Sequence, residues 1–186
     1  MTDDPYLNPY REHAKRHGPD WRVSLWASEQ SQVLRFDIFT QMCFLAGKRI
    51  LDAGCRRRDF AAFLIERDVP FSNYVGVDAI STVIDFATRR HLRHCEFHTA
   101  DLLRDPAAFR IGAPQIICMS GTLNTMDDTQ VMTVLENAWN AAEEALMFNF
   151  LSDRTGRDAI PQDGYTRRFD TMKLLDWAFR KTWNVC

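Results

Sequence analysis

The chain lacks the features that mark secreted, membrane-spanning or general nucleic-acid-binding proteins. Its first residues, MTDDPYLNPY, are acidic and polar where a secretory signal would be basic and then apolar, and no apolar run approaches membrane-spanning length. With 23 basic and 25 acidic residues, it has no positive excess for binding nucleic acid. We therefore expect a cytoplasmic protein that acts on a small molecule, with neither a membrane nor a nucleic acid as partner.

Cysteines are few, and their pattern excludes two common kinds of framework. The five cysteines are odd in number and contain no CxxC pair, so they indicate neither a disulfide scaffold nor a zinc site. We expect reduced, mostly buried thiols and no bound metal. A length of 186 residues suits one domain with a sizeable core.

From residue 48 onward, short apolar runs alternate with segments of helical periodicity, which predicts an α/β fold with a doubly wound, mainly parallel sheet. We predict one compact unit, in which residues 48–186 form this domain and residues 1–47 form an N-terminal helical cover. The predicted strands are 49–53, 74–79, 95–100, 115–121 and 145–151. The predicted helices are 10–17, 28–44, 59–67, one from Ser81, one from Asp127 to Trp139, and 171–181.

Acidic residues lie at the ends of the first three predicted strands. Asp52 comes just before Gly54, and Asp78 and Asp101 end the next two units. In open parallel sheets, ligands bind beyond the carboxyl ends of the strands, where the winding reverses. A carboxylate after the second strand is suited to accept both hydroxyls of a ribose, and Asp101 can accept from an exocyclic amine such as that of adenine. Each acid alone also fits a helix cap or a turn, but together they indicate a ligand site.

The segments LDAGC, VGVDA and ADLL resemble, in order and spacing, the first three cofactor-binding motifs of class I S-adenosylmethionine-dependent methyltransferases. The match extends over about residues 48–151. The resemblance implies a Rossmann-like methyltransferase fold and S-adenosylmethionine as cofactor. It places Asp52 and Gly54 beside the methionine end, Asp78 and Ala79 at the ribose, and Asp101 with Leu102 at the adenine. Ser120, Gly121 and Thr122 would line the far wall.

One part of the motif departs from the family. The glycine-rich turn is here Gly54, Cys55, Arg56, Arg57, Arg58. Left-handed backbone costs a residue with a Cβ about 1–2 kcal/mol, and side chains at these positions would occupy cofactor volume. Three alternatives stay open: the arginines face solvent and activity persists, the site is closed in a pseudoenzyme, or Arg56 and its neighbours form an anion pocket for a phosphate-bearing ligand.

The C-terminal segment is a second departure. Members of the family continue past the last helix with a hairpin that completes the sheet, and here that hairpin is expected to be missing. The strand at 145–151 would then lie at an edge, where an apolar strand tends to associate. We therefore expect a homo-oligomer, or a hetero-complex in which a partner covers this edge.

Methyl transfer requires alignment and removal of the acceptor's proton, so it needs neither a metal nor a covalent nucleophile. Two hypotheses follow: an S-adenosylmethionine-dependent methyltransferase acting on a small acceptor, or a catalytically inactive methyltransferase-like subunit with a structural or regulatory role through a protein partner. The candidate catalytic residues are Asn124, Asn149 and Asp153. The candidate substrate-binding residues are Trp26, Gln32, Arg35 and Thr122.

Overall fold

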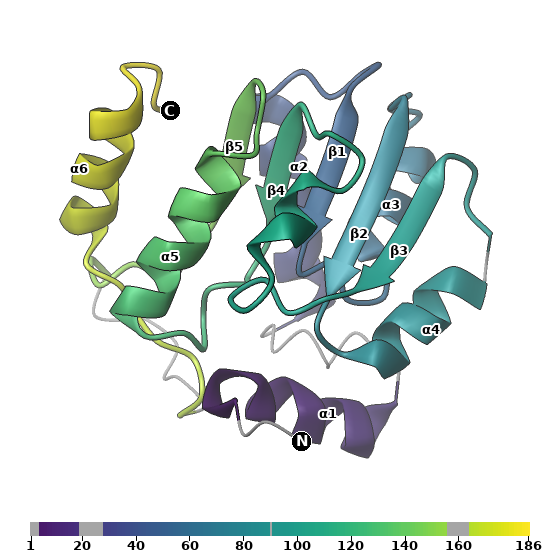
Figure 1. Cartoon of the computed structure of the whole chain (residues 1–186), viewed down its shortest axis with the longest axis horizontal. Coiled ribbons are helices and arrows are strands. Elements are labelled where there is room, and N and C mark those ends of the chain that lie inside the picture. Colours follow the sequence, from purple (N-terminus) through teal and green to yellow (C-terminus); the bar gives the residue numbers. More distant parts are fainter. Residues whose placement is uncertain (1–3, 19–27, 90, 156–163) are drawn as a thin grey trace.

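The computed structural model describes residues 4–18, 28–89, 91–155 and 164–186. Five strands form one sheet in the order β3-β2-β1-β4-β5, and every neighbouring pair is parallel (Figure 1). The strands are β1 (Arg49–Ala53), β2 (Asn73–Asp78), β3 (Cys95–Thr99), β4 (Ile116–Met119) and β5 (Ala145–Phe148). The predicted doubly wound parallel sheet is confirmed.

The winding of the sheet reverses between β1 and β4. The chain first builds outward from β1 through β2 to β3, and then returns to place β4 on the other side of β1, followed by β5. The carboxyl ends of β1 and β4 therefore border the crevice at which doubly wound sheets bind their ligands. Here β5 forms one edge of the sheet, since β4 is its neighbour on the inner side and no second neighbour occurs among the described residues.

Alternate strand residues pack into two apolar cores, one on each face of the sheet. Leu51, Val75 and Ile117 belong to a core with α4 (Ser81–Arg89), α5 (Asp128–Trp139) and α6 (Thr171–Lys181). Ile50 and Tyr74 belong to the opposite core, with α2 (Glu29–Met42) and α3 (Asp59–Glu66). Both faces of the sheet are thus covered by helices, as a parallel sheet requires.

Several helix ends form where the sequence provides a capping side chain. Asp170 accepts the backbone N–H groups of Met172 and Lys173 at the start of α6, at 3.0 and 3.1 Å. Asp127 and Gln130 form a reciprocal capping box at the start of α5. These caps explain why the predicted starts of both helices agree with the structure.

Other boundaries and faces differ from the prediction. The strand predicted over 145–151 ends at Phe148, and a short helix, η3 (Pro106–Arg110), was not predicted. On α2, Phe36 and Phe39 are buried as expected, whereas Val33 is 37% exposed. Of the five cysteines, all free thiols, Cys55 and Cys118 are buried, which is fewer than expected.

The N-terminal helices lie in two separate parts of the fold: η1 (Pro5–Leu7) and α1 (Asn8–His17) at the strand ends, and α2 on one face of the sheet. The short helix η1 and helix α1 lie along the edge of the sheet at which the strands end (Figure 1). Helix α2 instead packs against α3 through Phe36, which contacts Phe60 and Phe63 at ring-centre distances of 5.0 and 5.5 Å. Therefore η1 and α1 are placed to influence a ligand at the strand ends, whereas α2 supports the sheet from one face.

None of the helices in the described part of the chain combines the length and apolar character needed to cross a bilayer. Within the same ranges, no three side chains among His, Cys, Asp and Glu are grouped as metal ligands would be.

Candidate ligand-binding site

A small cavity lies at the carboxyl ends of the strands, under η1 and α1. Its volume is about 50 Å³, room for a few water molecules, whereas pockets for small-molecule ligands commonly measure about 300–1,000 Å³. The walls come from the turn after β1, the end of β2 with the segment after it, α4, the segments that follow β3 and β4, and the N-terminal segment. The lining residues are Tyr6, Leu7, Tyr10, Gly54, Arg56, Asp78, Ala79, Ile80, Val83, Ala100, Leu102, Thr122 and Met126.

The turn after β1 keeps left-handed backbone at three alternate residues. The φ angles are +89° at Gly54, +50° at Arg56 and +74° at Arg58. At Gly54 a Cβ would lie 2.5 Å from the Oγ1 atom of Thr122, which donates a hydrogen bond to the Ala53 carbonyl at 2.6 Å. Gly54 is therefore required by both conformation and space. At Arg56 and Arg58 the fold accepts strain of about 1–2 kcal/mol each.

Arg56 points into the crevice between β1 and β4. Its guanidinium donates from Nη1 to the Ser120 carbonyl at 3.3 Å and from Nη2 to the Gly121 carbonyl at 3.2 Å. The guanidinium carbon also lies 5.4 Å from the centre of the Tyr10 ring, within range of a cation–π contact. Arg56 thus bridges from the β1 turn to the end of β4 and fills the space between them.

Arg56 and Arg58 are 6% and 8% exposed. The alternative in which these arginines face solvent therefore does not hold. Arg58 does not line the cavity, and its positive charge acts near Cys95 at the start of β3. There burial raises the pKa of the Cys95 thiol to about 11, while the charge of Arg58 acts in the opposite direction.

Asp78 ends β2 with its carboxylate at the cavity. One oxygen accepts the Arg56 backbone N–H at 3.0 Å and the other accepts the Ile80 N–H at 2.9 Å. Burial raises the pKa of Asp78, while these N–H groups and the Arg56 charge oppose that change. An ionised carboxyl has about four acceptor sites, so Asp78 keeps capacity for ligand hydroxyls. Its backbone bonds also fix the turn that carries Arg56.

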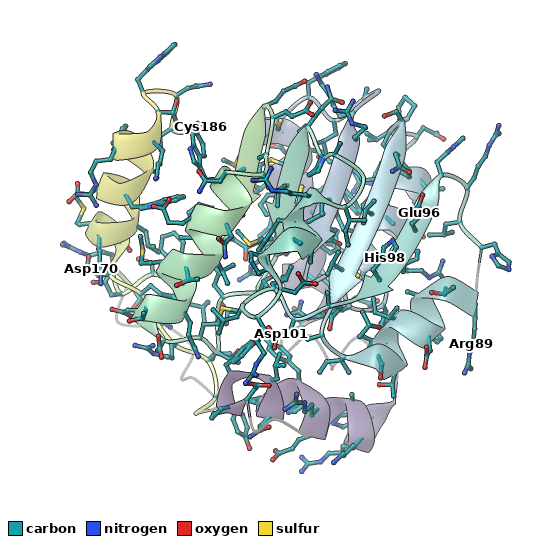
Figure 2. The ribbon with its side chains drawn as sticks, in the orientation of Figure 1. Arg89, Glu96, His98, Asp101, Asp170 and Cys186 are labelled. Carbon is teal, nitrogen blue, oxygen red and sulfur yellow. The ribbon has the colours of Figure 1, made fainter. Side chains whose placement is uncertain are left out.

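Asp101 and Leu102 follow β3 at the far end of the cavity. Asp101 accepts the Leu103 N–H at 3.0 Å and the Tyr6 hydroxyl, and Figure 2 places it between the sheet and α1. Leu102 is buried and lines the cavity with Ile80 and Val83. The Leu102 backbone N–H makes no hydrogen bond to any described residue.

The N-terminal segment is held to the strand ends by polar contacts at both of its helices. Tyr6 in η1 donates to Asp101, and Tyr10 in α1 donates to the Gly121 carbonyl at 3.2 Å. Asp4, which is buried, accepts from the Nε atom of Arg104 at 2.9 Å. Burial and the neighbouring Asp101 raise the pKa of Tyr6 beyond its usual range. Residues 4–10 therefore close one side of the cavity.

The site also includes Tyr6, Leu7 and Tyr10, which were not among the predicted site residues. The spacing of Tyr6 and Tyr10 could have indicated them, because tyrosines four positions apart lie on one face of a helical segment. The spacing does not predict which surface this face contacts, since that surface comes from residues about a hundred positions away.

The structure brings most of the predicted cofactor-binding residues together. Gly54, Arg56, Asp78, Ala79 and Leu102 line the cavity, Asp101 contacts a lining tyrosine, and Ser120 accepts from Arg56 through its carbonyl.

Asp52 is the exception, and the prediction that it lies by the ligand disagrees with its position. Strand residues alternate between faces, and Leu51 and Ala53 belong to the core on the α5 side. Asp52 therefore points to the opposite face, where its carboxylate accepts the Tyr74 hydroxyl at 2.5 Å. Burial raises the pKa of Asp52 to about 7, although the Tyr74 hydrogen bond and the Arg56 charge act to lower it.

Of the predicted acceptor-side residues, Thr122 lines the cavity and two asparagines lie next to it. Asn149 accepts the Gly121 N–H at 2.8 Å and donates to the Ser120 hydroxyl at 3.3 Å, so it braces the loop after β4. Asn124 is buried in that loop, and its Oδ1 atom has no hydrogen-bond partner among the described residues.

Three further candidates make contacts away from the cavity, and a fourth lies outside the described residues. Gln32 donates to Asp59 at 3.3 Å and Arg35 donates to the Ser31 carbonyl at 2.6 Å, both on the α2 side of the sheet. Asp153 accepts from the backbone and hydroxyl of Thr171 at 3.0 and 2.9 Å, at the start of α6. The fourth candidate, Trp26, is not among the residues that the structure describes.

No protein-family model and no curated protein matches the chain. Solved structures do match. The phosphoethanolamine N-methyltransferase 1 of Haemonchus contortus, in complex with phosphoethanolamine and S-adenosylhomocysteine, gives a TM-score of 0.69 at 18% identity over 94% of this chain and 40% of that one. The DhpI–SAM–HEP complex gives 0.67 at 11% identity, covering 97% and 90%.

Magnesium protoporphyrin IX methyltransferase from Synechocystis PCC 6803, with bound SAH, gives a TM-score of 0.61 at 12% identity, covering 98% of this chain and 81% of that one. Similarity at these identities shows the fold, and the chain has the Rossmann-like fold of class I S-adenosylmethionine-dependent methyltransferases. The chain spans less than half of the phosphoethanolamine enzyme that it matches.

We predict that Gly54→Ala destabilises the protein more than Gly47→Ala. Both glycines have positive φ, but a Cβ meets nothing within 4 Å at Gly47 and meets Thr122 at Gly54. Gly47→Ala should cost about 1–2 kcal/mol from backbone strain, and Gly54→Ala should cost more. Thermal and urea denaturation measure both variants. Equal losses would mean that the contact with Thr122 does not constrain the turn.

We also predict that Asp52 makes stability depend on pH. Its pKa in the folded state, about 7, lies above the unfolded value of about 3.9, so folding is favoured most below pH 4 and loses stability as pH rises through 7. Asp52→Asn should therefore raise Tm relative to the unmodified protein at pH 8.5, with a smaller gain at pH 5.

The matched control is Asp85→Asn, which changes an exposed acid on α4 and should shift Tm little at either pH. An Asp52→Asn gain that does not grow between pH 5 and pH 8.5 would contradict the prediction.

Proposed function

We propose that this chain binds S-adenosylmethionine in the cavity at the strand ends and is a methyltransferase that acts on a small acceptor. The observation that supports this most is the convergence of three recognition elements on one cavity: the turn at Gly54, the Asp78 carboxylate, and the Asp101–Leu102 segment. Each comes from a different βα unit, and each offers a group suited to one part of the cofactor.

The residues around the cavity offer the groups that the adenosine half of the cofactor requires. Asp78 would accept the ribose hydroxyls, since it retains acceptor capacity beside its two backbone bonds. Ile80, Val83 and Leu102 provide apolar surface for the faces of the adenine. The Leu102 N–H and the Asp101 carboxylate would address its polar edge, with the Tyr6 hydroxyl shifting away from Asp101 as the ring enters.

The amino-acid half fits less well. The Arg56 guanidinium lies on the Ser120 and Gly121 carbonyls, and the cavity of about 50 Å³ is far below the usual size of a ligand pocket. Binding the whole cofactor therefore requires Arg56 and the Tyr10 ring to move.

When bound, the cofactor supplies a methyl group that its sulfonium already activates. The chain's part is to align the acceptor for in-line attack, to exclude water and to accept or pass on a proton. Thr122 is at the cavity wall. The amide oxygen of Asn124, which has no hydrogen-bond partner among the described residues, lies in the same loop, so we assign the acceptor side to this loop. A small acceptor suits a cavity closed by η1 and α1, and the Haemonchus neighbour was solved with the small molecule phosphoethanolamine.

A catalytically inactive, methyltransferase-like subunit is the second candidate. The specific observation that favours it is the side chain of Arg56, which already makes two hydrogen bonds inside the site. In that case the fold would serve a structural or regulatory role through a protein partner.

We further propose that a second chain covers the β5 edge, by homo-oligomerisation or in a hetero-complex. Phe148 and Trp177 lie beside this edge in an apolar groove of about 310 Å³. Exposed apolar edges are association sites in parallel sheets. A cytoplasmic location agrees with five free cysteines, since reduced thiols are typical of that compartment.

We predict that isothermal titration detects binding of S-adenosylmethionine and S-adenosylhomocysteine, and that Asp78→Asn weakens it at least tenfold. The amide removes the negative charge and half of the acceptor capacity that would hold the ribose. Asp85→Asn, which changes an exposed acid on the neighbouring α4, should bind as the unmodified protein does.

Absence of heat at millimolar ligand with a folded protein would remove the methyltransferase proposal and leave the inactive subunit. Binding that Asp78→Asn leaves unchanged would show instead that the ribose assignment is wrong.

For the edge, we predict a solution mass above the 21.6 kDa of one chain in light scattering at tens of micromolar, falling on dilution. If the partner is a second copy, the mass should approach twice that of one chain. A mass of one chain across the whole concentration series would argue against self-association through β5.

A further inference from the structure

Arg56 holds its guanidinium where two backbone carbonyls converge at the reversal of the sheet. The Ser120 and Gly121 oxygens accept from Nη1 and Nη2 at 3.3 and 3.2 Å. Carbonyl oxygens are acceptors only, so this pair is suited to a donor-rich cation such as a guanidinium or an ammonium. The site thus holds a cation supplied by the chain itself.

The carbonyls are fixed independently of Arg56. Asn149 accepts the Gly121 N–H at 2.8 Å and donates to the Ser120 hydroxyl at 3.3 Å. If the guanidinium leaves, the two oxygens therefore remain in place as an acceptor site for another cation.

We infer that Arg56 competes with the ammonium group of the cofactor's amino-acid tail for these two carbonyls. Arg56 therefore weakens binding of adenosine ligands that carry this tail relative to adenosine without it. This inference rests on the proposed adenosine site. An adenosine with no amino-acid tail enters without displacing Arg56. A ligand with the tail must first remove a buried, hydrogen-bonded guanidinium from the two carbonyls.

The charge of the ligand adds a second difference. S-adenosylmethionine carries a sulfonium cation near its tail, whereas S-adenosylhomocysteine has a neutral thioether there. A guanidinium inside a buried site repels the sulfonium more strongly than it would in water. Removal of Arg56 should therefore help S-adenosylmethionine more than S-adenosylhomocysteine.

The competitor is also tied to the N-terminal segment. Tyr10 donates to the same Gly121 carbonyl as Arg56, at 3.2 Å, and its ring lies 5.4 Å from the guanidinium carbon. Displacement of Arg56 removes this ring contact. Binding of a tailed ligand is therefore expected to loosen α1, while adenosine leaves α1 in place.

The test is isothermal titration of adenosine, S-adenosylhomocysteine and S-adenosylmethionine against Arg56→Ala. Alanine removes the guanidinium but keeps a Cβ at φ +50°, so the backbone strain is unchanged. The matched control is Arg57→Ala, because Arg57 pairs with Asp59 at 2.9 Å and does not line the cavity. Arg56→Gly serves as a second variant, since glycine tolerates this φ if alanine folds poorly.

In Arg56→Ala we expect at least tenfold tighter S-adenosylhomocysteine, a larger gain for S-adenosylmethionine, and adenosine affinity within about threefold of the unmodified protein. Arg57→Ala should change none of the three. Unchanged or weaker binding of the tailed ligands in Arg56→Ala and Arg56→Gly would overturn the inference, and weaker binding would mean that Arg56 pairs with the ligand carboxylate. If none of the three ligands binds the variants or the unmodified protein, the proposed function fails as well. If adenosine alone fails to bind, this inference fails and the proposed function stands.

Discussion

The left-handed turn between β1 and α3 is the constraint on which the site depends. Its backbone follows the conformation that glycines would give, with φ of +50° and +74° at Arg56 and Arg58. The turn keeps this conformation because Asp78 accepts the Arg56 N–H and because the two arginines are buried among groups that bind them. The strain of about 1–2 kcal/mol at each residue is small beside the interactions that a buried charge requires. The turn thus has, at two arginines, a backbone conformation that glycine adopts most readily.

The same turn both holds the Asp78 carboxylate at the cavity and fills part of that cavity with the Arg56 side chain. Its backbone orients Asp78 toward the cavity, while one of its side chains fills the part of the cavity next to β4. Because a buried guanidinium needs acceptors, the Ser120 and Gly121 carbonyls are engaged within the chain itself. Under the proposed function, a ligand would therefore displace different groups in the adenosine half and in the amino-acid half of the site. Because the Arg56 side chain occupies the space next to β4, the cavity that remains at the strand ends measures only about 50 Å³.

Much of the fold was predictable because periodicity and capping are local. The parallel sheet, the Asp170 cap and the carboxylates after β2 and β3 follow from short stretches of sequence. The position of Asp52 also follows from strand alternation, once Leu51 is known to face the α5 side. The direction of Arg56 and the docking of Tyr6 were not predictable, since both depend on partners 64 and 95 positions away. Spacing along the chain does not specify which distant carbonyl or carboxylate a side chain will meet.

The N-terminal segment illustrates how such distant contacts shape the behaviour of a fold. Tyr6 and Tyr10 join partners 95 and 111 positions later, so η1 and α1 can dock only after β3 and β4 have assembled. Contacts of such long sequence separation form late and carry the largest chain-closure cost. The same segment also places Tyr6, Leu7 and Tyr10 in the apolar core on the α5 side, so its docking adds apolar burial to these two polar contacts. The thirteen residues of η1 and α1 therefore depend on the completed sheet, and they cover the strand ends only once it has formed.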